Sequence, residues 1–186
     1  MNSVLSTREL SENDIELLLQ YWFASEHTFL HGMGVDIQKM PTKEIFKETL
    51  VEQLSTPLDK KKSYCIIWMV NGVAIGHSNI NQIIFGEEAF MHLHIWTASE
   101  RKSGNGTALV KMTLPYFFEK LKLKKIFCEP SALNPSPNKT LEKVGFELVK
   151  KYKTTPGAIC YEQEVNRWVL TEERWLRLRS ATDWVW

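Results

Sequence analysis

Apolar side chains recur at helical spacing through much of the first third of the chain. Residues 11–25 and 41–54 each carry an early hydroxyl side chain that can cap a helix, and both predict helices. Residues 27–36 lie between them, contain two glycines and show no period, so we expect a loop there. Residues 4–10 predict a short opening strand.

Strand-like runs fill the middle of the chain. Residues 63–70, 73–84 and 89–96 are rich in β-branched and aromatic side chains. Asn71 and Gly72 join the first two runs, and this pair is the strongest short hairpin signal. The three runs therefore predict an antiparallel meander.

Helices and strands alternate in the second half. Residues 107–123 predict a helix that Pro115 should kink or divide. Residues 124–130 predict a strand, which should lie parallel to the third meander strand through a right-handed crossover. The remaining elements are a short helix in 134–146 that ends at Gly145, and an antiparallel pair, 146–155 and 158–170, around Pro156 and Gly157.

This element order predicts the α+β fold class, with a central mixed, mostly antiparallel sheet of about seven strands flanked by helices. A length of 186 residues favours one domain, which we place at residues 1–171. Residues 172–186 form a C-terminal aromatic tail, either helical or docked, with Trp175, Trp184 and Trp186. The tail can pack on its own domain or form a dimer contact, so both a monomer and a homodimer are expected.

Composition narrows the partners. The chain has 23 basic and 22 acidic residues and a net charge of +1, which predicts neither nucleic acid nor a membrane as the main partner. No apolar run is long enough to span a bilayer, and the N-terminus does not resemble a signal peptide. The three cysteines are widely spaced and include no Cys-x-x-Cys, so we expect reduced thiols and a cytoplasmic protein.

The segment RKSGNGT, residues 101–107, joins a predicted strand to a predicted helix. Unpaired backbone N–H groups and the helix dipole favour an anion at such a helix start. Gly104 and Gly106 would let the backbone wrap closely around a phosphate. The spacing fits neither the P-loop of nucleotide-binding proteins nor the Rossmann fingerprint.

Arg101-x-x-Gly104-x-Gly106 resembles the Arg/Gln-x-x-Gly-x-Gly/Ala motif of the GNAT acyl-CoA N-acyltransferases. The segment NPSPNKTLEKVGF, residues 134–146, resembles the second signature of that family, in which an Asn precedes a helix and a Gly-Phe pair. The two motifs stand in the family order, and the predicted elements match the family fold over residues 4–170. The resemblance therefore implies a GNAT-like fold and an acyltransferase.

Acetyl-CoA, or coenzyme A after transfer, is the co-substrate that the resemblance implies. It assigns the CoA pyrophosphate to the glycine loop, and it assigns the pantetheine arm to the end of the preceding strand, by strand-like pairing. Asn134 would bind the pantetheine or the reacting end. The implied cofactor-binding residues are Ile95, Trp96, Thr97, Arg101, Lys102, Ser103, Gly104, Asn105, Gly106, Thr107, Asn134 and Asn138.

His92 and His94 are the candidate catalytic residues. They share strand parity and point to one face, and the resemblance places the general base on this strand. An imidazole near its reference pKa of about 6.5 suits proton removal at neutral pH. We favour His92 as the base, with His94 as its partner or substitute.

The acid for the leaving thiolate is left open. Many family members have a tyrosine where this chain has Leu141. Other candidates nearby are Cys128, Ser131, Ser136 and Asn138, and a CoA thiolate can also leave without an acid.

No metal is expected. Gly86-x5-His92-x-His94 matches the first half of a cupin metal motif, but no histidine follows His94 and Glu100 is too distant in sequence.

The acceptor is open between two branches of the family. The segment LNPSPNKTLEKVGFE, residues 133–147, looks like the ribosomal-protein N-terminal acetyltransferases, while CEPSALN with HLHIW looks like the siderophore-type acyltransferases. We expect an acyl transfer to a primary amine of a small molecule or peptide, by direct attack in a ternary complex. The alternative is a non-catalytic CoA-binding regulatory or interaction module.

Overall fold

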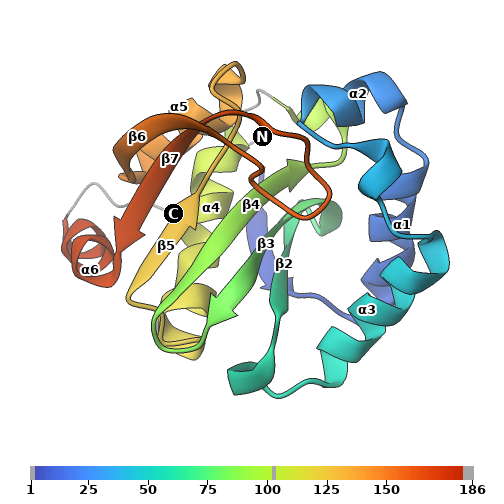
Figure 1. The fold of residues 1–186 in the computed structure, drawn as a ribbon. Coiled ribbons are helices and arrows are strands. Elements are labelled where there is room, and N and C mark those ends of the chain that lie inside the picture. Colours follow the sequence, from blue (N-terminus) through green and yellow to red (C-terminus); the bar gives the residue numbers. More distant parts are fainter. Residues whose placement is uncertain (1–2, 102–103, 182–186) are drawn as a thin grey trace.

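The computed structural model describes residues 3–101 and 104–181. Across these residues one sheet has seven strands in the order β1-β2-β3-β4-β5-β7-β6 (Figure 1). Their bounds are β1 Leu5–Glu9, β2 Ser63–Val70, β3 Val73–Ile84, β4 Glu88–Ile95, β5 Lys125–Cys128, β6 Glu147–Thr154 and β7 Gln163–Thr171. β4 and β5 run parallel, and the other neighbouring strands are antiparallel. The predicted α+β class with a mixed, mostly antiparallel sheet is confirmed.

Helices cover the sheet on both faces. Their bounds are α1 Ile15–Phe23, α2 His27–Gly32, α3 Lys43–Ser55, α4 Asn105–Pro115, α5 Pro135–Val144 and α6 Glu172–Ser180. The larger core joins one face of the sheet to α4 and α5, with Trp68, Leu109 and Leu141 fully or almost fully buried. Smaller clusters under α1 and α3 cover the other face of the first strands, where Ile67 packs beside Leu18. Figure 1 shows α4 behind the sheet and α1 to α3 along its other side.

The hairpin between β2 and β3 turns at the predicted residues. Asn71 and Gly72 both have positive φ, 50° and 80°, as a two-residue type I′ turn requires. Pro115 also acts as expected: regular α4 ends there, and a π-helical turn, Tyr116–Lys120, follows.

The expected loop at residues 27–36 is wrong in its first half, because α2 occupies His27–Gly32. A helix of six residues is too short to show a period in sequence. Tertiary packing stabilises it instead, since Leu30 is buried in a cluster with Tyr21 and Val35. Gly34, with φ 92°, then turns the chain away.

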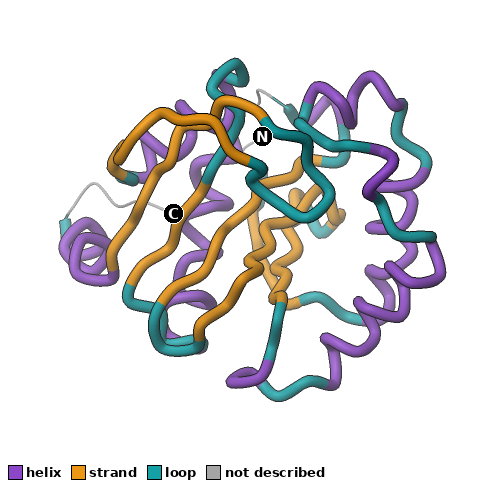
Figure 2. Tube along the Cα trace, viewed as in Figure 1, coloured by secondary structure: helices purple, strands orange, loops and turns teal. Residues whose placement is uncertain are grey.

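The last hairpin has a longer connection than the sequence predicts. β6 and β7 pair antiparallel, but β7 begins only at Gln163. The intervening β6–β7 loop, residues 155–162, bonds to the segment after α2: the N–H of Asp36 donates to the Ile159 oxygen at 2.8 Å, and that of Tyr161 to Gly34 at 3.1 Å. Figures 1 and 2 show this loop reaching across the sheet toward α2.

The described half of the aromatic tail is helical and docked. Trp175 of α6 is only 1% exposed, and its ring stacks on Phe118 with 4.8 Å between centroids. Trp184 and Trp186 lie outside the described residues. None of the helices in residues 3–101 and 104–181 has both the length and the apolar content to cross a bilayer.

Candidate active site

β4 and β5 separate partway along their length. Their pairing ends at Phe90 and Phe127, whereas β4 continues beside β3 as far as Ile95. The N–H of Trp96 donates to the Ile75 oxygen at 2.8 Å, so even-numbered residues of β4 direct their backbone groups toward β3. The alternating pattern leaves the backbone of Leu93 and Ile95 facing the gap. A ligand can therefore pair with this strand edge, except at the Ile95 oxygen, which accepts from Arg101.

The N-terminus of α4 lies at the open end of this gap. α4 begins at Asn105, after Gly104 in the left-handed region with φ 89°. A Cβ at Gly106 would lie 4.0 Å from both the Ile95 and Thr140 side chains, so the helix start sits between β4 and α5. A helix start of this kind suits a phosphate, because the helix dipole favours an anion there. Lys102 and Ser103, also expected to bind the pyrophosphate, lie outside the described residues.

Arg101 holds the end of β4. Its guanidinium donates from Nε to the Ile95 oxygen at 3.1 Å and from a terminal nitrogen to the Trp96 oxygen at 3.3 Å. The same group lies over the Phe29 ring, 4.1 Å from its centroid. Arg101 thus links the glycine loop to α2, in addition to bringing a positive charge to the gap.

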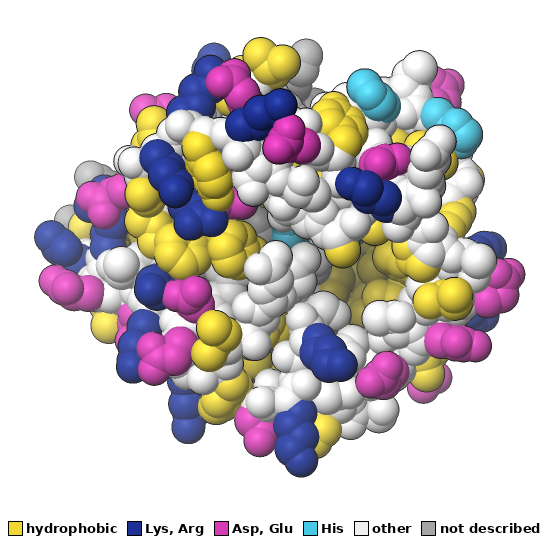
Figure 3. All heavy atoms as spheres, in the orientation of Figure 1, with side chains coloured by type: hydrophobic (Ala, Val, Ile, Leu, Met, Phe, Trp, Pro, Cys, Tyr) yellow, Lys and Arg dark blue, Asp and Glu magenta, His cyan; other side chains and the backbone are white. Residues whose placement is uncertain are grey.

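A pocket of about 320 Å³ opens where the gap meets α1, α2 and the β6–β7 loop. On the face drawn in Figure 3 the surface is hollowed near its centre, where histidine and hydrophobic side chains are visible. The polar, charged and thiol side chains that line the pocket are Tyr21, His92, His94, Arg101, Cys128, Glu129, Ser131, Asn134, Ser136, Thr140, Cys160 and Gln163. The structure therefore brings both predicted catalytic histidines, Asn134 and part of the glycine loop to one cavity.

His92 lines this pocket and has a ring nitrogen that is not used in any hydrogen bond to the described residues. Its Nε2 is buried and has no hydrogen-bond partner among the described residues. Burial lowers the pKa of His92 to about 4, although the nearby charge of Glu129 acts in the opposite direction. The imidazole is therefore neutral at pH 7 and can accept a proton, but it is a weaker base than its reference pKa implied.

His94 belongs to an aromatic cluster. Burial, reinforced by His77 and His92, lowers its pKa well below the usual value. Its Nδ1 lies 3.2 Å from the Tyr21 hydroxyl, and its ring stacks on His77 with 4.6 Å between centroids. His77 Nδ1 in turn accepts a hydrogen bond from the Trp96 indole at 2.8 Å.

Neither Tyr21 nor His77 was among the predicted site residues. The register of β3 and β4 places His77 opposite His94, so hairpin parity could have found that pair. Nothing in the sequence signals the contact of Tyr21, which lies on α1, with a strand more than 70 residues away.

Asn134 and Asn138 differ in function. The Asn134 side chain caps α5 by accepting from the N–H of Ser136 at 3.3 Å, and it also lines the pocket. The Asn138 amide donates to the Ser131 and Asn134 oxygens and accepts from Asn166 and Trp168. These four bonds use its whole capacity, so Asn138 braces the β5–α5 loop against β7 and is not part of the pocket lining.

The remaining candidates divide by exposure to the pocket. Ile95 lines it, whereas the Trp96 indole turns toward His77 and Thr97 lies exposed beyond β4. Leu141 is completely buried in the core, so no acid replaces the usual tyrosine at that position. Cys128 lines the pocket, and burial raises its thiol pKa to about 12, so it stays protonated. In the described part of the chain no three His, Cys, Asp or Glu side chains gather as a metal site.

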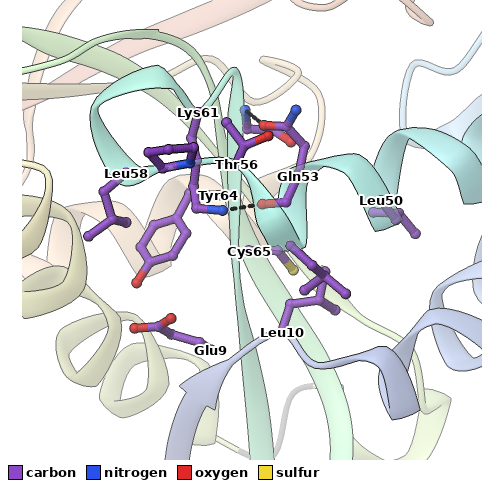
Figure 4. Close-up of a pocket in the computed structure, with 12 residues that line it drawn as sticks. Glu9, Leu10, Leu50, Gln53, Thr56, Leu58, Lys61, Tyr64 and Cys65 are labelled. Atoms are coloured by element: carbon purple, nitrogen blue, oxygen red, sulfur yellow. Dashed lines mark hydrogen bonds between the residues drawn. The ribbon is translucent and has the colours of Figure 1, made fainter.

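A second pocket, also of about 320 Å³, lies between the end of β1, the start of β2 and α3. Figure 4 shows the Tyr64 hydroxyl directed toward the Glu9 carboxylate, with Lys61 on the other side. This hydroxyl has no hydrogen-bond partner of normal geometry among the described residues. The second pocket shares no lining residue with the first and contains no histidine, so it cannot supply the same chemistry.

Comparison with protein families identifies the class that this fold and gap define. The model of the acetyltransferase (GNAT) domain matches residues 5–147. That match covers most of the chain, so the protein belongs to the GNAT acetyltransferases. It is accordingly an N-acetyltransferase, and its acyl donor is acetyl-CoA.

Solved structures share the fold at low sequence identity. The aminoglycoside acetyltransferase AAC(6′)-Ib in complex with coenzyme A is 20% identical, with a TM-score of 0.72, over 95% of this chain and 100% of that chain. The spermidine/spermine N-acetyltransferase SpeG from Vibrio cholerae is 17% identical, with a TM-score of 0.72, over 95% of this chain and 97% of that one. A comparison with curated protein sequences finds no match.

Proposed function

We propose that this enzyme acetylates a primary amine of a small molecule, by direct attack in a ternary complex with acetyl-CoA. The observation that carries the proposal is the pocket, which extends from the β4–β5 gap to side chains of α1, α2 and the β6–β7 loop. Its volume of about 320 Å³ suits a small acceptor better than a folded protein surface. The similar enzymes are named for aminoglycosides and for spermidine, which are small amines.

His92 acts as the base in this proposal. The amine nitrogen forms a bond to the thioester carbon, the carbonyl π electrons move to oxygen, and the C–S bond then breaks to release the thiolate. The proton lost by nitrogen goes to His92 Nε2, the ring nitrogen that has no partner. A base with a pKa of about 4 cannot deprotonate a free alkylammonium ion, so the amine must enter neutral and lose its proton after attack, when it is more acidic.

The gap supplies the remaining groups. Gap-facing backbone N–H groups of β4 can donate to the oxyanion, since such donors stabilise charge that develops during acyl transfer. The helix start at residues 104–107 binds the CoA pyrophosphate, and Asn134 binds near the reacting end. All three cysteines are free thiols, and we therefore also propose that the enzyme works in the reducing cytoplasm.

The test measures CoA thiol release from acetyl-CoA with a panel of polyamines, aminoglycosides and short peptides. At least one small amine should give steady turnover, and His92→Gln should lower kcat by roughly 100-fold with little change in the KM for acetyl-CoA. His27→Gln, an exposed position on α2, is the matched control and should leave the rate unchanged. In addition, kcat/KM should rise with pH as the amine loses its proton, without a histidine limb near pH 6.5.

Two results would contradict the proposal. Tight binding of acetyl-CoA without turnover of any amine would favour the non-catalytic CoA-binding module. Full activity in His92→Gln would remove His92 as the base while leaving the acyltransferase reaction in place.

A further inference from the structure

Tyr21 stands between two acceptors at the wall of the acceptor pocket. Its side chain is only 6% exposed, and its hydroxyl lies 3.2 Å from His94 Nδ1 and 3.2 Å from the Met33 sulfur. Burial raises the Tyr21 pKa, so the phenol keeps its proton at any physiological pH. A phenol has a single proton and can donate it to only one of the two acceptors.

The identity of that acceptor fixes the tautomer of His94. If Tyr21 donates to Met33, its oxygen must accept from His94, and the His94 proton lies on Nδ1. If Tyr21 donates to His94 Nδ1, the neutral ring carries its proton on Nε2. A thioether sulfur is a weak acceptor and an imidazole nitrogen a strong one, so the second arrangement is favoured. Because burial keeps His94 neutral, it has one ring proton to place.

The neighbouring histidine is arranged in the same way. His77 Nδ1 accepts from the Trp96 indole, which can only donate, so a neutral His77 also carries its proton on Nε2. Its ring stacks on that of His94 at an angle of 18°. The two stacked rings are compatible when both are neutral. If both were protonated, their positive charges would repel each other.

We propose that His94 is a neutral hydrogen-bond donor, through Nε2–H, to the negative charge that develops at the thioester, and that Tyr21 is the positioning residue that selects this tautomer. The inference rests on the proposed function and divides the work of the two histidines. His92 has a free Nε2 and accepts the proton of the amine, while His94 has its Nδ1 occupied and donates. His94 gives a hydrogen bond and keeps its proton, so no charge is left on its ring. His94 would thus supply a hydrogen-bond donor in a chain that has Leu141 where many family members have a tyrosine.

Nitrogen-15 NMR of the histidine rings in the free protein tests the assignment without any substrate. His94 signals are identified by comparison with His94→Gln. At pH 7 the wild-type spectrum should show a protonated Nε2 and an unprotonated Nδ1 for His94. A proton on Nδ1 in the wild-type protein would overturn the proposal, because His94 would then have a basic Nε2. This readout needs no turnover, so it stands whether or not an amine acceptor is found.

Variants at Tyr21 and Met33 separate the two acceptors. Tyr21→Phe should move part of the His94 population to the Nδ1–H tautomer. It should lower kcat roughly 10-fold, which is less than the loss expected if the His94 donor were removed altogether. Met33→Leu removes only the sulfur and should leave the tautomer as it is in the wild type. An unchanged tautomer in Tyr21→Phe would rule out Tyr21 as its selector. Failure to acetylate any amine, with the expected tautomer present, would count against the proposed function and against donation to a thioester, but not against the tautomer assignment.

Discussion

His77, His92 and His94 lie within one small region, and burial is the main cause that lowers the pKa of each. A sequence can place two histidines on one face of a strand, as strand parity does for His92 and His94. It does not show how deeply the rings are buried, and burial decides whether each is a proton acceptor, a neutral donor or a stacked neighbour. Burial argues against the expected base near its reference pKa, because it disfavours the charged imidazole.

Acid should destabilise the fold through these residues. Burial lowers the His77 pKa to about 3, well under the unfolded value of 6.5. Below pH 6.5 His77 is protonated in the unfolded chain but stays neutral in the folded chain. The free energy of unfolding therefore falls as pH falls toward 3. His77→Gln keeps an acceptor for Trp96 but cannot titrate, and should reduce this slope by about 1.4 kcal/mol per pH unit.

Urea unfolding between pH 7 and pH 4 measures the free energy of unfolding of the wild type and of His77→Gln. The slope of this free energy against pH is compared, and not its absolute value. His27→Gln, at an exposed position, should keep the wild-type slope. Equal slopes in His77→Gln and the wild type would show that His77 is protonated in the fold.

At the scale of elements, the sequence predicted the helices, strands and turns that have a strong local signal. It missed the segments whose conformation depends on tertiary packing. The β2–β3 hairpin and the end of α5 at Gly145, with φ 102°, follow from residues that tolerate positive φ. α2 and the β6–β7 loop were missed or misplaced because their conformations depend on contacts with each other, such as the stacked rings of His31 and Tyr161. These two segments line the pocket that we propose for the acceptor, so the choice of acceptor was the property least accessible to sequence reasoning.

α6 is part of the packed fold in the described structure, and its main anchor is Trp175. Replacing this buried side chain with alanine should lower the free energy of unfolding by about 3 kcal/mol. Leu176→Ala, at a 48% exposed position on the same helix, should change it by no more than about 0.5 kcal/mol. Chemical denaturation of both variants checks this, and similar values for the two would show that α6 does not need its contact with Phe118.

At the scale of the whole molecule, element order and two short motifs were enough to predict the fold and the class of enzyme. The parallel pairing of β4 with β5 explains why. A right-handed crossover through α4 brings the glycine loop to the end of β4, and the early end of β5 leaves that strand edge free. In the proposed account the CoA chain binds where this topology leaves strand edge, and acceptor choice depends on the surfaces of α2 and the β6–β7 loop.

The central claim is that the thioester sits in the β4–β5 gap beside His92 and His94, and a crystal structure with coenzyme A tests it most directly. The pyrophosphate should contact the backbone at residues 104–107, the pantetheine should lie along the gap side of β4, and the sulfur should lie in the pocket with both histidines. Coenzyme A bound elsewhere, or with its sulfur directed away from these rings, would contradict the account.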